Sequence, residues 1–213
     1  MNYSVVIVAA GSGERMKLGY NKVFYQFKDG DMMIDKSIKL FKADKKCKQI
    51  IVVTNPENFS RICKHCYGSF VIVAGGKTRQ ESVFNGLTCV NQNYVYIHDG
   101  ARPYVSNAAL LRLNNALKFN PACLLAVKAV DTIKYVENQK VSETLNRENI
   151  YLAQTPQAFE TNLLYNCYLK AKNDDYNATD DSQLVEKYSE ESIMIVEGDY
   201  KNIKITNMED IGG

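Results

Sequence analysis

The chain has 213 residues, of which 46% are hydrophobic and 23% are charged, and its formal net charge at pH 7 is +2. This composition is ordinary for a folded globular protein, and the length suits one domain that buries roughly 70% of its unfolded surface. So small a net charge argues against nucleic acid or a membrane surface as a partner, because both attract strongly basic proteins. No apolar run approaches the ~20 residues of a membrane span, and we expect no signal peptide because the N-terminus leads directly into a strand-like run.

The first predicted strand, residues 5–10, ends in a glycine-containing loop. β-branched residues dominate the run, which is typical of a buried parallel strand, and Gly11 and Gly13 follow it. Glycines let backbone N–H groups approach phosphates closely, and Arg15 and Lys22 add two cations nearby. The loop therefore indicates a polyphosphate site, although a tight strand-to-helix turn without a ligand explains the glycines alone equally well.

Two common phosphate-binding motifs are excluded by their spacing. A dinucleotide fingerprint needs a third glycine where Met16 stands, and an acidic residue near the end of the second strand, which ends in Thr54. The phosphate loop of kinases and ATPases needs a Gly-Lys-Ser/Thr sequence where Met16-Lys17-Leu18 stands. The glycine loop is therefore of neither kind.

Strand-like and helix-like segments alternate from residue 5 to residue 129. The strand-like runs cover residues 5–10, 49–54, 70–74, 94–98 and 123–129. The helical patterns between them cover residues 33–43, 56–66, 80–90 and 107–119. This alternation predicts an α/β fold with a mainly parallel twisted sheet flanked by helices, whose ligands bind beyond the carboxyl ends of the strands.

The pattern then changes to a predicted β-hairpin over residues 131–145, where alternating residues flank a polar turn at 137–140. An isolated hairpin is marginal by itself, so a second subunit or the rest of the domain must cover it, and the pattern favours neither. Residues 154–159 have too little apolar pattern for an element and are predicted to form an ordered loop. The other elements expected are strands near 151–153, 192–196 and 203–205, helices near 161–172 and 181–188, and a final helical turn whose capping box joins Thr206 to Glu209.

The six cysteines are scattered, which favours free thiols in a reduced, cytoplasmic protein over a disulfide framework. Cys63-Lys64-His65-Cys66 has the spacing of a metal or redox pair. A structural zinc would need a second cluster, however, and a redox pair opens a helix, whereas this one closes a predicted helix. We expect these side chains to be structural.

Polar clusters also follow two later strands. Residues 75–82 combine two glycines with hydroxyls ahead of a helix, which offers a second place for backbone groups to meet a ligand. At the end of the next strand, Asp99 faces the same edge, and a carboxylate opposite a polyphosphate loop is a natural ligand for Mg²⁺. The alternatives are that Asp99 is a cap or forms an ion pair with Arg102, and that His98 is a packed core residue.

The order of these blocks is more specific than any one of them. Six blocks follow one another along the chain: Ala9-Ala10-Gly11-Ser12-Gly13-Glu14-Arg15-Met16 with Lys22, Gly75-Gly76-Lys77-Thr78-Arg79-Gln80-Glu81-Ser82, His98-Asp99-Gly100-Ala101-Arg102-Pro103, Gln154-Thr155-Pro156-Gln157, Thr179-Asp180-Asp181 and Asn202-Ile203-Lys204-Ile205-Thr206. Together they resemble the 2-C-methyl-D-erythritol 4-phosphate cytidylyltransferases of isoprenoid biosynthesis, over nearly the whole chain.

The resemblance implies one Rossmann-like nucleotidyltransferase domain over residues 1–213, with a projecting β-arm at 131–150 that clasps a second subunit. It implies a homodimer that joins CTP to 2-C-methyl-D-erythritol 4-phosphate, a sugar-alcohol phosphate, and releases pyrophosphate, with Mg²⁺ as the cofactor. Nucleic acid and membranes are not expected as partners.

The resemblance also assigns roles to individual residues. The catalytic cations would be Arg15, Lys22 and Lys204, and the metal ligand would be Asp99. The residues expected around the nucleotide are Ala9, Ala10, Gly11, Gly13, Gly76, Ser82 and Asp99. Those expected to meet the sugar phosphate are Arg102, Thr132, Arg147, Thr155, Thr179 and Lys204, of which Thr132 and Arg147 would reach the neighbouring subunit's substrate from the arm.

Two positions depart from the family pattern, since Gly100 stands where alanine is more common and Lys77 occupies a base-contacting position that can be acidic. The ribitol 5-phosphate cytidylyltransferases of teichoic acid synthesis share most of the blocks and are one alternative, although residues 9–11 and 178–181 look closer to the isoprenoid enzymes. A nucleotide-binding regulatory module without turnover is the other. The cations and the carboxylate together argue against it, because a pure binder has no leaving group to neutralise.

Overall fold

The computed structural model describes residues 1–11, 13, 16, 18–65 and 70–211. Its strands and α-helices are, in chain order, β1 (Tyr3–Val8), α1 (Met33–Ala43), β2 (Cys47–Thr54), α2 (Phe59–His65), β3 (Val71–Ala74), α3 (Arg79–Leu87), β4 (Tyr94–Asp99), α4 (Asn107–Ala116), β5 (Ala122–Lys128), β6 (Ile133–Glu137), β7 (Lys140–Leu145), β8 (Tyr151–Glu160), α5 (Thr161–Asn173), α6 (Asp181–Tyr188) and β9 (Ile193–Glu197). Short 3₁₀ turns include Lys22–Phe24, Pro56–Asn58, Arg147–Asn149 and Met208–Ile211.

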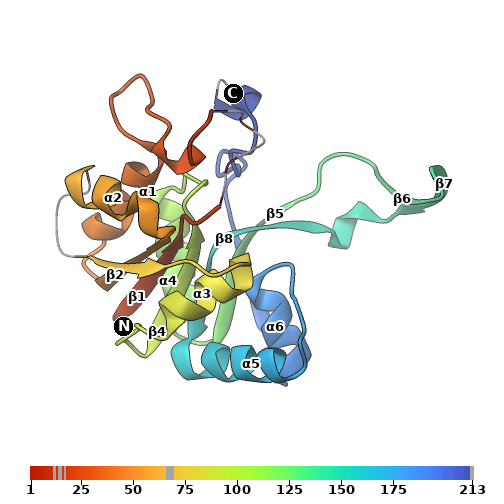
Figure 1. The fold of residues 1–213 in the computed structure, drawn as a ribbon. Coiled ribbons are helices and arrows are strands. Elements are labelled where there is room, and N and C mark those ends of the chain that lie inside the picture. The colour runs from red at the N-terminus through yellow and green to blue at the C-terminus, as the bar shows by residue number, and fades with distance from the viewer. Residues whose placement is uncertain (12, 14–15, 17, 66–69, 212–213) are drawn as a thin grey trace.

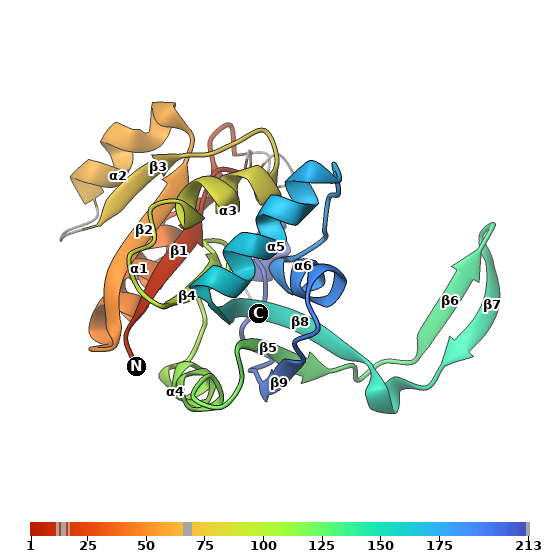
Figure 2. The same cartoon turned by 90° about the horizontal axis from the view of Figure 1, so that it is seen from below.

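Seven strands form one central sheet in the order β3-β2-β1-β4-β8-β5-β9 (Figure 1; the two edge strands, β3 and β9, are labelled in Figure 2). β1 pairs in parallel with β2 and β4, and β2 pairs in parallel with β3. β8 is antiparallel to both β4 and β5, whereas β9 is parallel to β5. The predicted mainly parallel sheet is therefore confirmed, with β8 as the strand that runs against its neighbours.

The side chains of β1 show how the sheet supports a core on each face. Val5 and Ile7 pack into the apolar cluster that contains residues of α1 and α4. Val6, which lies between them, packs into the cluster that contains residues of α3, α5 and α6. Because successive side chains of a strand point to opposite faces, a strand covered on both sides needs an apolar residue at every position. The continuous apolar run in the sequence records this double burial.

The prediction of an ordered loop over residues 154–159 is wrong. These residues form the buried half of β8, where they pair with β4 and β5. The apolar pattern does not reveal the strand because its buried polar groups are satisfied by side-chain hydrogen bonds. Gln157, for example, donates through Nε2 to Asp180 Oδ2 over 2.8 Å and accepts the Ser182 backbone N–H at Oε1 over 3.0 Å.

The end of the chain also differs from expectation. Residues 203–205 do not form a strand, and the Ile205 N–H instead donates to the Ala101 carbonyl over 2.8 Å. The final turn, Met208–Ile211, is capped by Asp210 rather than by the expected Glu209. Oδ2 of Asp210 accepts the backbone N–H groups of Thr206 and Asn207 over 2.6 and 2.8 Å. The predicted capping box is therefore wrong, because the acidic residue that caps the turn is Asp210 and not Glu209.

The hairpin β6-β7 projects well away from the sheet (Figure 2). Tyr135, Val136 and Val141 on this ribbon are each at least half exposed. The rest of the domain, as far as the structure describes it, does not cover the ribbon. The alternative in which the hairpin is stabilised by packing against its own domain is therefore wrong. We call residues 131–150, which include this ribbon and its base, the arm.

Five cysteines of the described segments carry free thiols: Cys47, Cys63, Cys89, Cys123 and Cys167. Cys66, the second member of the Cys63-Lys64-His65-Cys66 sequence, lies outside the described residues. In the part of the chain that the structure describes, no three His, Cys, Asp or Glu side chains come together as metal ligands. None of the described helices is both long enough and apolar enough to cross a bilayer.

Candidate active site

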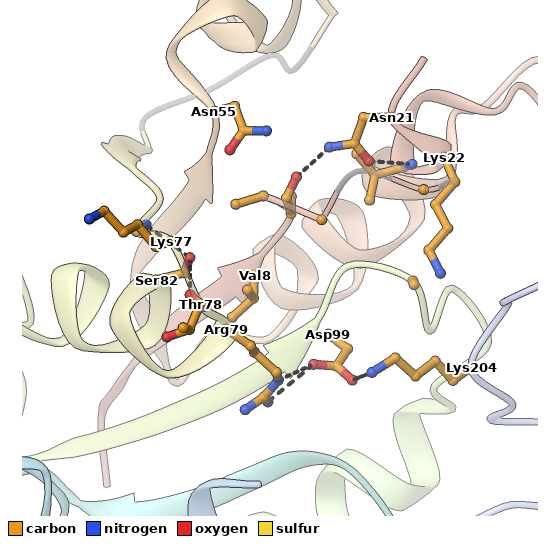
Figure 3. Close-up of a pocket in the computed structure, with 17 residues that line it drawn as sticks. Val8, Asn21, Lys22, Asn55, Lys77, Thr78, Arg79, Ser82, Asp99 and Lys204 are labelled. Atoms are coloured by element: carbon orange, nitrogen blue, oxygen red, sulfur yellow. Dashed lines mark hydrogen bonds and ion pairs between the residues drawn. The ribbon is translucent and has the colours of Figure 1, made fainter. Parts of the chain in front are cut away.

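A cavity of about 600 Å³ lies at the carboxyl ends of the parallel strands (Figure 3). Its walls come from the end of β1 and the glycine loop, the residue after β2, the loop before α3, the end of β4, and the segment after β9. The lining includes every residue expected around the nucleotide, namely Ala9, Ala10, Gly11, Gly13, Gly76, Ser82 and Asp99, together with Lys22 and Lys204. Arg15, the third expected cation, lies outside the described residues.

Asn21 fixes Lys22 against the glycine loop. Its side chain accepts the Val23 N–H and donates to the Ala9 carbonyl over 2.6 Å, which caps the turn that begins at Lys22. Gly13 has a φ of +71°, and a Cβ built there would lie 2.7 Å from the Lys22 backbone nitrogen. Glycine is therefore required where the loop passes this turn. Asn21 is not among the predicted site residues, although an asparagine before a helical turn is a recognisable cap.

The loop before α3 is held by its own hydroxyls. Gly76 donates its N–H to Ser82 Oγ over 3.0 Å, and that hydroxyl donates to the Thr78 carbonyl over 2.9 Å. A Cβ at Gly76 would lie 2.3 Å from Cβ of Glu81, so the close approach of the loop to α3 requires glycine. Ser82 is thus a buried support of the loop, while the Lys77 side chain extends away from Asp99 (Figure 3).

Asp99, the last residue of β4, lies between two cations. Its Oδ2 is 2.8 Å from Nζ of Lys204, and its Oδ1 accepts hydrogen bonds from Nε and Nη2 of Arg79 over 3.2 and 3.1 Å. Burial by itself would raise the pKa of Asp99, but the charges of Arg79 and Lys204 outweigh it and hold the pKa well below the usual range. The carboxylate is therefore ionised at neutral pH, and its ion-pair partners are Arg79 and Lys204 rather than the suggested Arg102.

Arg79 is the main residue that the sequence analysis missed. Nη2 of its guanidinium also contacts Oδ2 of Asp181 over 2.8 Å, and the Tyr168 hydroxyl donates to Oδ1 of the same carboxylate over 2.5 Å. Asp181 begins α6 and is fully buried. Only the position of an arginine in a glycine-containing loop before a helix hinted at this role.

His98 is the packed core residue that one interpretation of the sequence expected. Its ring nitrogens lie 3.2 Å from Ser37 Oγ and 3.1 Å from Thr155 Oγ1, and burial lowers its pKa to about 4. Thr155 Oγ1 also accepts the backbone N–H of Asp99 over 3.0 Å. Thr155 therefore supports Asp99 from inside the protein instead of facing the cavity.

The family model for 2-C-methyl-D-erythritol 4-phosphate cytidylyltransferase matches residues 3–212. The chain belongs to this family. The enzyme of that name from Bacillus pumilus is 40% identical over 217 residues, which cover 99% of this chain and 94% of the relative. The one from Clostridioides difficile is 40% identical over 216 residues, which cover 98% and 90%. The crystal structure of 4-diphosphocytidyl-2C-methyl-D-erythritol synthase from Anaerococcus prevotii has a TM-score of 0.86 at 36% identity and covers 99% of this chain and 92% of that one.

Membership of the cytidylyltransferase family confirms the resemblance seen in the six sequence blocks. It makes the chain a nucleotidyltransferase, and it favours the isoprenoid enzymes over both the ribitol 5-phosphate relatives and a binding module without turnover. The α/β architecture with a mostly parallel sheet agrees with the solved members of the family.

Except for Lys204, the residues that the cytidylyltransferase pattern assigns to the sugar phosphate do not line this cavity. Arg102 donates through Nη1 to the Asn202 carbonyl over 2.7 Å, and its Nε is buried without a partner among the described residues. Thr179 lies at a smaller hollow of about 290 Å³, which Tyr151 also lines at the base of the arm. The remaining two, Thr132 and Arg147, are exposed on the arm.

Proposed function

We propose that the protein is a 2-C-methyl-D-erythritol 4-phosphate cytidylyltransferase that joins this acceptor to CTP and releases pyrophosphate. The observation that carries the proposal is the meeting of Lys22, Asp99 and Lys204 with two glycine loops around one cavity. These residues come from distant parts of the chain. The identity of the substrates is inferred from the family to which the chain belongs.

The chemistry requires positioning and charge rather than a protein nucleophile. An oxygen of the acceptor phosphate attacks the α-phosphorus of CTP, a new P–O bond forms, and the bond to the leaving pyrophosphate breaks. Both reactants are anions, and negative charge accumulates on the leaving group. Groups that are already oriented toward that charge lower the barrier because they need no reorganisation during the reaction.

The two lysines of the cavity suit this task. Nζ of Lys204 forms an ion pair with Oδ2 of Asp99, and Nζ of Lys22 donates to the carbonyl of Ile205 over 2.7 Å. Both ammonium groups are therefore held beside the same short segment, 204–205, where a triphosphate in the cavity would meet them. We assign them to the phosphates of CTP, with Arg15 as the third cation.

Magnesium belongs to the proposal, with Asp99 as its protein ligand. Among the described residues, Oδ2 of Asp99 accepts one hydrogen bond, from Lys204, and a carboxylate oxygen has room for a second interaction. One carboxylate is sufficient because Mg²⁺ commonly takes its other ligands from phosphate oxygens and water. When bound, the ion would offset the charge of the triphosphate.

The arm is proposed to form a homodimer and to complete the site of the second subunit. Exposed apolar side chains on a ribbon that projects from the domain favour a protein partner, and Thr132 and Arg147 lie on the same arm. Replacing residues 131–148 by a short glycine-containing turn should give monomers without activity, as measured by light scattering and pyrophosphate release.

Complementation would separate this proposal from a role of the arm in its own subunit. We expect Arg147→Ala and Lys22→Ala to be nearly inactive alone. After they are unfolded together and refolded as a mixture, heterodimers would contain one intact site, and about a quarter of the wild-type rate should return. A mixture as inactive as its parents would contradict a contribution of the arm to the other subunit's site.

The substrates are tested by measuring pyrophosphate release from CTP with each acceptor. We expect 2-C-methyl-D-erythritol 4-phosphate to be preferred over ribitol 5-phosphate by about 10–200-fold in kcat/KM, the range for one apolar group in a fitted pocket. A preference for ribitol 5-phosphate would change the acceptor only. Absence of pyrophosphate with either acceptor would overturn the proposal.

A further inference from the structure

Arg79 is held between two carboxylates on two different elements. Its Nη2 bridges Asp99 Oδ1 and Asp181 Oδ2 over 3.1 and 2.8 Å, and its Nε adds a second bond to Asp99 Oδ1 over 3.2 Å. Figure 3 shows the guanidinium directed at Asp99 from the start of α3. We infer that Arg79 is a positioning residue, which holds Asp99 Oδ1 so that Oδ2 faces the ligand, and that Asp181 is the anchor that orients Arg79.

The anchor is rigid because Asp181 has no freedom of its own. Its side chain is fully buried at the first turn of α6, and its second oxygen accepts the Tyr168 hydroxyl over 2.5 Å. A guanidinium is planar, so fixing Nη2 on Asp181 also fixes the direction of Nε. The orientation of Asp99 is thereby linked to α5 and α6 on one face of the sheet.

The two oxygens of Asp99 have partners that are held in different ways. Oδ2 pairs with Lys204, whose side chain is 39% exposed, whereas Oδ1 pairs with the anchored Arg79. This inference rests on the proposed function, in which Lys204 binds the nucleotide phosphates and Oδ2 of Asp99 has room for the metal ion beside its contact with Lys204. Arg79 then keeps the carboxylate in place by its contacts with Oδ1.

The charge balance indicates that Arg79 supports Asp99 and takes no direct part in the reaction. Arg79 and Lys204 neutralise Asp99 and Asp181, so the group of four carries no net charge. Burial lowers the pKa of Arg79, but Asp181 and Asp99 raise it by more, so the guanidinium stays charged. Its Nε and Nη2 are already committed to these two carboxylates.

The test compares four variants: Arg79→Met, Arg79→Lys, Arg79→Met with Asp181→Asn, and Asp99→Asn. Lys187→Met is the matched control, because it removes a cation from α6 whose ammonium stacks on Tyr176, away from the cavity. Calorimetry with CTP and Mg²⁺, without acceptor, measures metal-dependent binding in the absence of turnover. Thermal unfolding and the separate values of kcat and KM complete the measurements.

We expect Arg79→Met to raise the Mg²⁺ concentration for half-maximal CTP binding by about 10–100-fold, the usual cost of losing a group that orients a metal ligand. Arg79→Lys keeps the charge and should fold, yet a single ammonium cannot reproduce the fork, so about a tenfold rise is expected. The double variant removes one positive and one negative charge. It should regain thermal stability without regaining metal-dependent binding.

Wild-type metal dependence in a folded Arg79→Met or Arg79→Lys protein would overturn the inference while Asp99→Asn still supports the proposed function. Recovery of metal-dependent binding in the double variant would also overturn it, because Arg79 would then serve only to neutralise Asp181. If Asp99→Asn itself leaves metal dependence unchanged, the metal assignment in the proposed function fails, and the inference fails with it.

Discussion

The two walls of the cavity are built in different ways. On one wall, backbone groups and helix caps fix the glycine loops, as in the hydrogen bond from Gly76 to Ser82 and the capping of α3 by Thr78. On the other wall, charged side chains hold one another, as Asp99 does with Arg79 and Lys204. A backbone wall presents a fixed surface to a ligand, whereas a wall of ion pairs can exchange its partners when anionic ligands arrive.

Removing the proposed magnesium ion should have the largest effect, and it acts on the charged wall. Chelation with EDTA is expected to lower activity by about 10³-fold or more, because the triphosphate would lose its divalent counter-charge. Asp99→Asn should raise the magnesium requirement, and a magnesium titration of the rate measures the shift. Full activity after complete removal of divalent ions would show that the charged wall works without a metal.

Lys22→Ala should have the next largest effect, because Lys22 starts from the loop wall and reaches the segment that carries Lys204. Loss of one preorganised cation typically costs about 10²–10³ in rate. We expect kcat to fall by this factor while the thermal unfolding midpoint changes little, with Lys187→Ala as the control. A folded variant with near-normal kcat would remove Lys22 from the mechanism.

The backbone wall can be tested with a pair of glycine substitutions. Gly76→Ala places a Cβ 2.3 Å from Glu81 Cβ, whereas a Cβ at Gly11 meets nothing within 4 Å. Overpacking should cost Gly76→Ala about 1–3 kcal/mol in the free energy of unfolding. Gly11→Ala should be close to neutral in the same denaturant titration. Equal stability of the two variants would mean that the loop before α3 can shift to relieve this contact at little cost in free energy.

The same contrast explains which parts were predictable from sequence. β1 and α1 follow from local periodicity, since each position is buried or exposed according to the geometry of its own element. Arg79 could not be assigned in this way, because its anchor Asp181 is 102 residues further along the chain. The buried half of β8 was hidden for a related reason, as Gln157 finds its partners in and before α6. Long-range polar pairing leaves no periodic signal.

Near neutral pH, the smallest expected effect is the pH dependence of stability that His98 causes beneath the charged wall. Burial lowers the pKa of His98 from 6.5 to about 4, so between these values the unfolded chain binds a proton that the folded protein does not. Stability is therefore full above pH 6.5 and should fall by about 3 kcal/mol at most as the pH drops toward 4. The lowered pKa of Asp99 affects stability only below pH 3.8, the pKa of this residue in the unfolded chain, so it acts in a separate pH range. Urea unfolding at a series of pH values measures the free energy of unfolding. His98→Gln should flatten its pH dependence between pH 6.5 and 4. An unchanged pH dependence in that variant would assign it to other groups.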